Sequence, residues 1–81
     1  MVHHAALWAT VNHIAEINHI SCSCLARRCD LDSTTFNPSK RCTKYGQPRW
    51  ISTETLTKIL IATHTSPIEF AKILQTFLDP E

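Results

Sequence analysis

Hydrophobic residues recur at helical spacing along much of the chain, with polar residues and prolines between these stretches. In the first stretch, from about His3 to Ile17, Leu7, Val11 and Ile14 fall on one face of a helix. No segment alternates between apolar and polar residues with turn residues at both ends, which is the pattern of a half-buried strand. The sequence therefore predicts an all-α fold.

A second and a third helix are predicted in the next part of the chain. The second is short and follows Ser21, whose hydroxyl suits an N-cap. The third begins after Asp32, whose carboxylate can accept the free N–H groups of a helix from Ser33 to Arg41. Because Pro38 removes a hydrogen bond inside this segment, we expect the third helix to be short or kinked.

Two more helices are predicted after an exposed loop that contains Gly46, the only glycine. Ser52 caps the fourth helix, and His64-Thr65 ends it. The fifth opens with Ser66-Pro67-Ile68-Glu69, a capping box with proline at the first helical position. Because 81 residues suffice for one small domain, we expect residues 1–81 to form a single compact five-helix bundle.

The stretch from Ser21 to Arg41 has the pattern of a helix-turn-helix. Two short helices cross steeply only where a small residue lets them approach, and Ala26 can supply that contact. Asp30 occupies the turn, where the backbone is left-handed, and aspartate tolerates that conformation better than most residues. The apolar positions expected to hold the pair against the other helices are Leu25, Cys29, Leu31 and Phe36.

Six short motifs of this region and of the segment after it carry a family resemblance: Leu25-Ala26-Arg27-Arg28, Leu31-Asp32, Thr34-Thr35-Phe36-Asn37, Ser39-Lys40-Arg41, Arg49-Trp50 and Ser52-Thr53-Glu54. With them the chain resembles, over about residues 7 to 75, the helix-turn-helix domains of phage repressors of the lambda and LexA-like self-cleaving type. The resemblance implies a lambda-repressor-like fold whose third helix enters the major groove of a double-stranded DNA operator. It also implies repression of transcription by a homodimer.

Positive charge is concentrated in the middle of the chain. Residues 27–49 hold six lysines and arginines and two aspartates, a net charge of +4, although the whole chain carries only +1. Such a block is the electrostatic footprint of a face that meets phosphates, while a solvated face without any partner is an equally good explanation of the charge alone.

The candidate DNA contacts lie in the two predicted helices of this motif and in the loop that follows. Asn37 can pair with adenine, and the hydroxyls of Ser33, Thr34 and Thr35 can meet bases or phosphates. Taken singly, each could also be a cap or a surface residue; their order along the motif favours DNA. The residues expected to contact phosphates are Cys22, Ser23, Lys40, Arg41, Lys44 and Arg49.

The fifth helix carries a wide apolar stripe, which we interpret as a dimer contact formed by Phe70, Leu74, Phe77 and Leu78. The alternative function is a helical protein-interaction module that uses this stripe to bind a partner and does not bind DNA. The tryptophans, Trp8 and Trp50, are interpreted as core or loop-anchoring residues and not as platforms for unpaired bases.

Metal binding and catalysis find little support. The spacing C-x-C-x4-C-x12-C lacks the paired knuckles of a structural zinc site, so we expect free thiols at Cys22, Cys24, Cys29 and Cys42. The histidines are expected at the surface or in packing positions. No Ser-His-Asp order, carboxylate pair in an apolar setting or glycine-rich phosphate loop is present. We therefore expect no enzyme activity, no cofactor, no metal and no small-molecule substrate.

No apolar run approaches the roughly 20 residues that span a bilayer, and no charged start precedes an apolar signal segment. We accordingly expect a cytoplasmic, nucleoid-associated protein of bacterial or phage origin that does not contact membranes.

Overall fold

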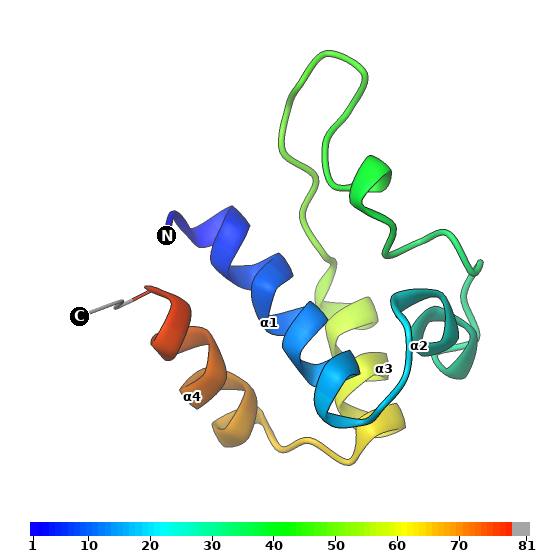
Figure 1. Ribbon diagram of the computed structural model, residues 1–81, viewed down its shortest axis with the longest axis vertical. Helices are drawn as coiled ribbons and strands as arrows, with labels where there is room; N and C mark the ends of the chain where they lie inside the picture. The colour runs from blue at the N-terminus through cyan, green and yellow to red at the C-terminus, as the bar shows by residue number, and fades with distance from the viewer. Residues whose placement is uncertain (79–81) are drawn as a thin grey trace.

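The computed structural model describes residues 1–78 and contains four α-helices and one short 3-10 helix (Figure 1). No described residue belongs to a β-strand, so the prediction of an all-α fold is confirmed. Within residues 1–78, no helix combines the length and the apolar character needed to cross a membrane. In chain order the elements are α1 (His3–Ile17), α2 (Cys22–Arg28), η1 (Pro38–Lys40), α3 (Thr53–Thr63) and α4 (Pro67–Leu78).

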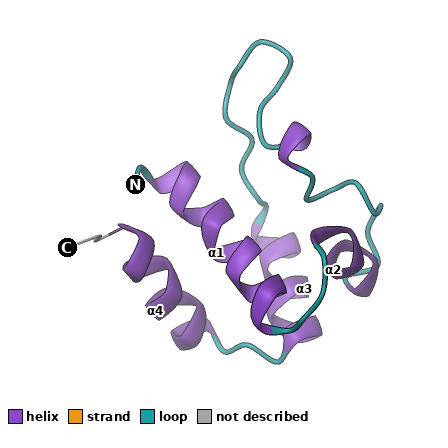
Figure 2. Cartoon of the chain, viewed as in Figure 1, coloured by secondary structure: helices purple, strands orange, loops and turns teal. Residues whose placement is uncertain are grey.

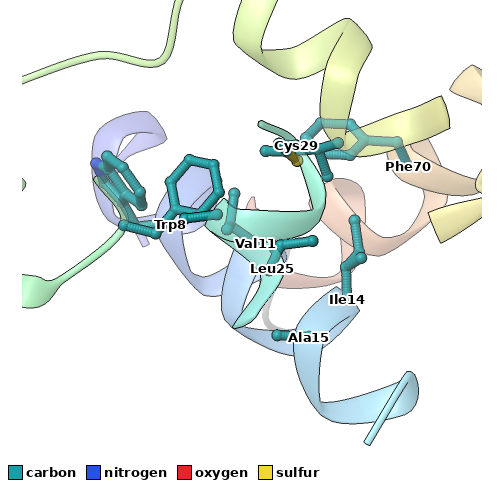
Figure 3. Close-up of a cluster of buried hydrophobic side chains, with 10 residues drawn as sticks. Trp8, Val11, Ile14, Ala15, Leu25, Cys29 and Phe70 are labelled. Atoms are coloured by element: carbon teal, nitrogen blue, oxygen red, sulfur yellow. The ribbon is translucent and has the colours of Figure 1, made fainter. Parts of the chain in front are cut away.

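Helix α1 organises the core, because α2 and α4 both pack against it. Its apolar stripe includes Val11 and Ile14, which are fully buried. Figure 3 shows these two side chains gathered with Leu25 of α2 and Phe70 of α4. Ile59 of α3 and Phe36 of the loop after α2 complete the cluster. Each large apolar side chain buried in this way contributes roughly 1.5–3 kcal/mol to folding.

The predicted serine caps are confirmed at α2, α3 and α4. The Ser21 hydroxyl accepts the Cys24 N–H at 3.1 Å, and the Ser52 hydroxyl accepts the Thr55 N–H at 3.1 Å. Each bond satisfies one of the N–H groups that the first turn of a helix leaves without a partner. Helices α2 and α3 therefore begin where the sequence predicted. Helix α1 has no side-chain cap among the described residues, but it also covers its predicted range.

The capping box at the start of α4 is also confirmed. The Ser66 hydroxyl accepts the Glu69 N–H at 3.0 Å, and the Glu69 carboxylate accepts the Ser66 N–H at 2.9 Å. Hydrogen bonds from the Ser66 N–H and from the Ser66 side chain lower the pKa of Glu69 below its usual range. The ionised carboxylate is thus part of the cap.

The predicted third helix is not an α-helix, and the prediction of five helices is wrong. Asp32 does cap the segment, since its Oδ1 accepts the Thr34 N–H at 2.9 Å and the Thr34 hydroxyl at 2.6 Å. However, only turns follow from residue 33 to 36, and then η1, the one short helical turn in the long loop between α2 and α3 (Figure 2).

Pro38 explains why the third helix fails. A proline disfavours the helical conformation of the residue before it, and Asn37 is extended, with φ −63° and ψ 146°. Proline also has no N–H with which to continue the hydrogen bonds of a helix begun at Ser33. The segment therefore breaks into a capped turn and a new 3-10 turn.

The corner after α2 has the expected turn conformation. Asp30 has φ 61°, in the left-handed region predicted for it, and the Leu31 N–H donates to the Ala26 carbonyl at 2.9 Å. Ala26 is fully buried, as a close approach requires. The corner thus joins α2 to a capped turn instead of to a second α-helix.

Candidate nucleic-acid interface

A hairpin of residues 41–49, here called the arm, projects away from the helices at one end of the molecule (Figure 1). Its two sides are joined by an antiparallel bridge between Cys42 and Pro48. The Thr43 N–H donates to the Gln47 carbonyl and the Arg49 N–H donates to the Arg41 carbonyl, both at 2.8 Å. The loop predicted here is therefore an ordered hairpin.

A tight turn closes the tip of the arm. The Gly46 N–H donates to the Thr43 carbonyl at 2.9 Å, and Gly46 has φ 80°, which side chains rarely allow. The Thr43 hydroxyl accepts the N–H groups of Tyr45 and Gln47 at 3.3 and 3.2 Å. These bonds fix the tip while leaving the side chain of Tyr45 80 % exposed.

The base of the arm is held by α1. The Trp8 indole N–H donates to the Arg49 carbonyl at 3.1 Å. Nε2 of His4 lies 3.0 Å from the same carbonyl and 3.0 Å from that of Arg41. Because a carbonyl only accepts, Nε2 of His4 carries the proton in both contacts.

Arg41, which was predicted to contact phosphate, points inward, and its guanidinium is bound by the protein itself. Its guanidinium donates to Oδ1 of Asn12 at 2.7 Å and to the Phe36 carbonyl at 3.0 Å. It also lies over the Trp8 ring, with 4.7 Å between the guanidinium carbon and the ring centre. Both hydrogen bonds come from one terminal nitrogen, Nη2, while Nε is buried without a hydrogen-bond partner among residues 1–78. The charge of Arg41 is thus used within the protein.

Three residues of α1 therefore hold the arm, and the sequence analysis missed their joint role. His4, Trp8 and Asn12 are spaced four residues apart, so they form one stripe along the helix. The signal was an aromatic ring flanked at i−4 and i+4 by hydrogen-bonding side chains. This pattern is common in helices, so by itself it does not identify which segment of the chain packs on the stripe.

A groove of about 550 Å³ lies between the segment after α2 and the segment before α3. It brings together four of the predicted DNA-binding residues, namely Thr34, Thr35, Lys40 and Arg49. Further lining residues include Asp32, Trp50, Ser52 and Thr55. The groove thus combines hydroxyls, two cations and an exposed aromatic ring.

The two tryptophans differ. Trp8 is buried, which confirms its interpretation as a core residue, but Trp50 is 59 % exposed and is not a core residue. The Trp50 ring meets His4 edge-on, with ring centres 5.3 Å apart, so it retains only a partial anchoring role. Its exposed face is available to the groove.

The predicted base-reading residues differ in their exposure and in the hydrogen bonds that their side chains already make. The Thr34 side chain is exposed, but its hydroxyl donates to Asp32, and this bond lowers the pKa of the Asp32 carboxyl. The Thr35 hydroxyl donates to the Asp32 backbone carbonyl at 2.7 Å. Ser33 and Asn37 are half-buried and do not line the groove.

Among the predicted phosphate contacts, Lys40, Lys44 and Arg49 are exposed. The ammonium of Lys44 lies over the neighbouring Tyr45 ring at 5.1 Å. The start of α2 is not part of the groove: the Cys22 thiol donates to Oδ1 of Asn12 at 3.3 Å, and Ser23 bonds the Ser21 hydroxyl at 3.1 Å.

The predicted dimer contact is largely used inside the chain. Phe70 is buried in the core, and Leu74 packs against it. Phe77 is half-buried and meets the His13 ring edge-on, with ring centres 6.2 Å apart. Leu78 is also half-buried. Because α4 packs on α1, little of the stripe remains for a second molecule.

The cysteines all lie in the described part of the chain, and each is a free thiol. Burial raises the pKa of Cys29, partly offset by the charge of Lys58, so this thiol is held protonated. Among residues 1–78, no three histidine, cysteine or acidic side chains come together as metal ligands would.

The chain matches no protein-family model, no curated protein and no solved structure.

Proposed function

We propose that this protein binds double-stranded DNA in a sequence-specific manner and acts as a transcriptional repressor of the phage type. One observation carries the proposal. From residue 33 to 53 the chain holds four cations and no acidic residue, and three of those cations, Lys40, Lys44 and Arg49, are exposed on the groove and the arm. Phosphates are the partner that such a surface fits best.

The groove supplies chemistry for reading as well as for affinity. Thr34, whose side chain is exposed in the groove, offers a methyl group to thymine and a hydroxyl oxygen as an acceptor, since its proton is donated to Asp32. Lys40 and Arg49, which both line the groove, fix the duplex by its phosphates without reading its sequence. Asp32 opposes phosphate approach on one wall, which favours a defined register of the duplex over diffuse binding.

A helix-turn-helix remains part of this proposal in a modified form. Helix α2 and the left-handed corner at Asp30 are retained, while the capped turn after Asp32 takes the place of the first turn of a recognition helix. Binding as a homodimer on two half-sites about one helical turn apart also belongs to the proposal.

The rival function, protein interaction through the apolar face of α4, has less support. That face packs against α1, and Phe70 is buried in the chain's own core. Its outward side carries Lys72 and Gln75, both exposed. These polar residues make α4 a poor apolar docking surface.

The test is binding to DNA selected from a random-sequence duplex pool, followed by fluorescence anisotropy at several salt concentrations. Lys40→Ala should weaken binding to all sequences and lower the salt slope by about 1, because one phosphate contact is lost. Thr34→Ala, which removes an exposed side chain from the groove, should relax the base preference at one position of the selected sequence. Lys72→Ala, which removes the same charge from α4, is the matched control.

Failure of the chain to enrich any sequence would contradict the proposal. So would equal effects of Lys40→Ala and Lys72→Ala, because binding would then follow total charge and not this surface.

A further inference from the structure

We propose that the tip of the arm, residues 44–47, is a second DNA-reading element that enters the minor groove of A/T-rich DNA flanking the principal site. This inference rests on the proposed function, and it adds a contact and a base preference that the groove does not account for.

The tip forms a surface of its own. A second hollow is lined by Cys42, Thr43, Lys44, Tyr45, Gln47 and Arg49, and of these only Arg49 also lines the groove. The arm also lies at one end of the longest dimension of the molecule, 34 Å (Figure 1). A duplex seated on the groove therefore meets the tip at a different place along its length.

In the proposed contact only the tip of the arm enters the groove. The arm is a short hairpin closed by a tight turn, and DNA-binding proteins use two-stranded segments in either groove of DNA. The minor groove is about 6 Å wide and excludes a helix of ordinary diameter. At the tip Gly46 presents bare backbone, with open space where a side chain would be, so a duplex can approach it closely.

The chemistry of the tip suits the minor groove of A·T pairs. Only hydrogen-bond acceptors face that groove, namely N3 of adenine and O2 of thymine. Lys44 and Gln47 both carry donors and are both exposed. The narrow minor groove of A/T-rich DNA has an enhanced negative potential that attracts lysine.

The arm is also held in place before any duplex binds. Three hydrogen bonds from His4 and Trp8 fix the carbonyls of Arg41 and Arg49 at its base, and the bonds of Thr43 fix the tip. A contact made by an ordered hairpin loses less conformational entropy than one made by a flexible loop.

The experiment uses the complete chain and duplexes that share one core, the sequence selected from the random pool, with flanks of A·T, G·C or inosine·C pairs. Inosine·C lacks the guanine amino group in the minor groove but keeps the hydrogen-bonding pattern of G·C in the major groove. We expect A·T and inosine·C flanks to bind equally and about five- to tenfold more tightly than G·C flanks.

The variant Lys44→Ala/Gln47→Ala should abolish this flank preference. It should also weaken binding to every duplex, because Lys44 belongs to the cationic surface of the proposed function. The preference for the core over unrelated sequences should remain, because neither residue lines the groove. Its matched control is Lys72→Ala/Gln75→Ala, which removes the same two side-chain types from exposed positions of α4. The control should retain both the flank preference and the core selectivity. Far-ultraviolet circular dichroism establishes that each variant is folded.

Several results would overturn the inference while leaving the proposed function intact. They are equal binding to all three flanks, inosine·C flanks that behave like G·C flanks, and an unchanged preference in the tip variant. Tip-dependent binding to phosphatidylserine vesicles without any flank preference would assign the arm to a membrane surface instead. Absence of core selectivity would overturn the proposed function and this inference together.

Discussion

The guanidinium of Arg41 lies between Trp8 and Asn12, stacked on the ring of one and hydrogen-bonded at 2.7 Å to the side chain of the other. A half-buried residue at the root of an exposed basic arm is thus bound by the protein itself. The relationship separates the charges of this segment into one that stabilises the fold and three that stay exposed.

We expect Arg41→Ala to lower the free energy of unfolding by about 2–3 kcal/mol, because it removes a cation–π contact and charge-assisted hydrogen bonds and leaves their partners unsatisfied. Arg41→Lys should recover less than half of the loss, since an ammonium cannot lie over the Trp8 ring as the planar guanidinium does while it donates to both oxygens. Urea denaturation measures both. An unchanged midpoint in the lysine variant would show that only the charge matters.

His4→Ala should loosen the arm without unfolding the helices, because His4 donates to two carbonyls at the base of the arm and belongs to no core cluster. Amide hydrogen exchange should accelerate at Thr43 and Arg49, whose N–H groups bond across the arm. The amide of Leu25 in α2 serves as the control. Equal acceleration at all three amides would mean that His4 supports the whole fold.

Pro38→Ala should lengthen the helical segment after Asp32. Alanine releases Asn37 from its extended conformation and supplies the N–H that proline lacks. We expect a stronger circular dichroism signal at 222 nm, since the capped turn at Thr34 can then continue as a helix. A signal identical to that of the original protein would show that the contacts of Phe36 and Arg41, and not proline, break the helix.

The capping carboxylate of Glu69 should make stability depend on acidity. Because its pKa is lower in the folded protein, its contribution is complete above about pH 4.5, its usual pKa range, and is lost as pH falls through the folded value. Glu69→Gln keeps a capping side chain but does not titrate at this position. The difference between the thermal midpoints of the two proteins should therefore shrink as pH falls below about 4.5 and through the lower folded-state pKa, and a difference that stays constant down to about pH 2 would contradict this prediction.

The sequence predicted the elements whose signals are local. Helix α1, the serine caps at Ser21 and Ser52 and the capping box before α4 all depend on neighbouring residues, so their signals are legible in the chain. The prediction of the third helix was wrong because Asp32 favours the start of a helix and Pro38, only six residues later, prevents its continuation.

The candidate site was less predictable because it depends on contacts between distant residues. Lys40, Lys44 and Arg49 were predicted and are exposed. The inward turn of Arg41 depends on Asn12, 29 positions earlier, and the base of the arm depends on His4, 45 positions before Arg49. Spacing along a sequence carries no signal for partners so far apart.

Helix α1 holds the arm through the backbone carbonyls of Arg41 and Arg49 and through the Arg41 side chain. The position of the arm therefore does not depend on the side chains at its tip. Residues 44, 45 and 47 can thus be replaced without disturbing the helices, as residues of an antibody loop can be replaced on its framework. Other short turns can therefore be grafted between Thr43 and Pro48 on an unaltered helical scaffold.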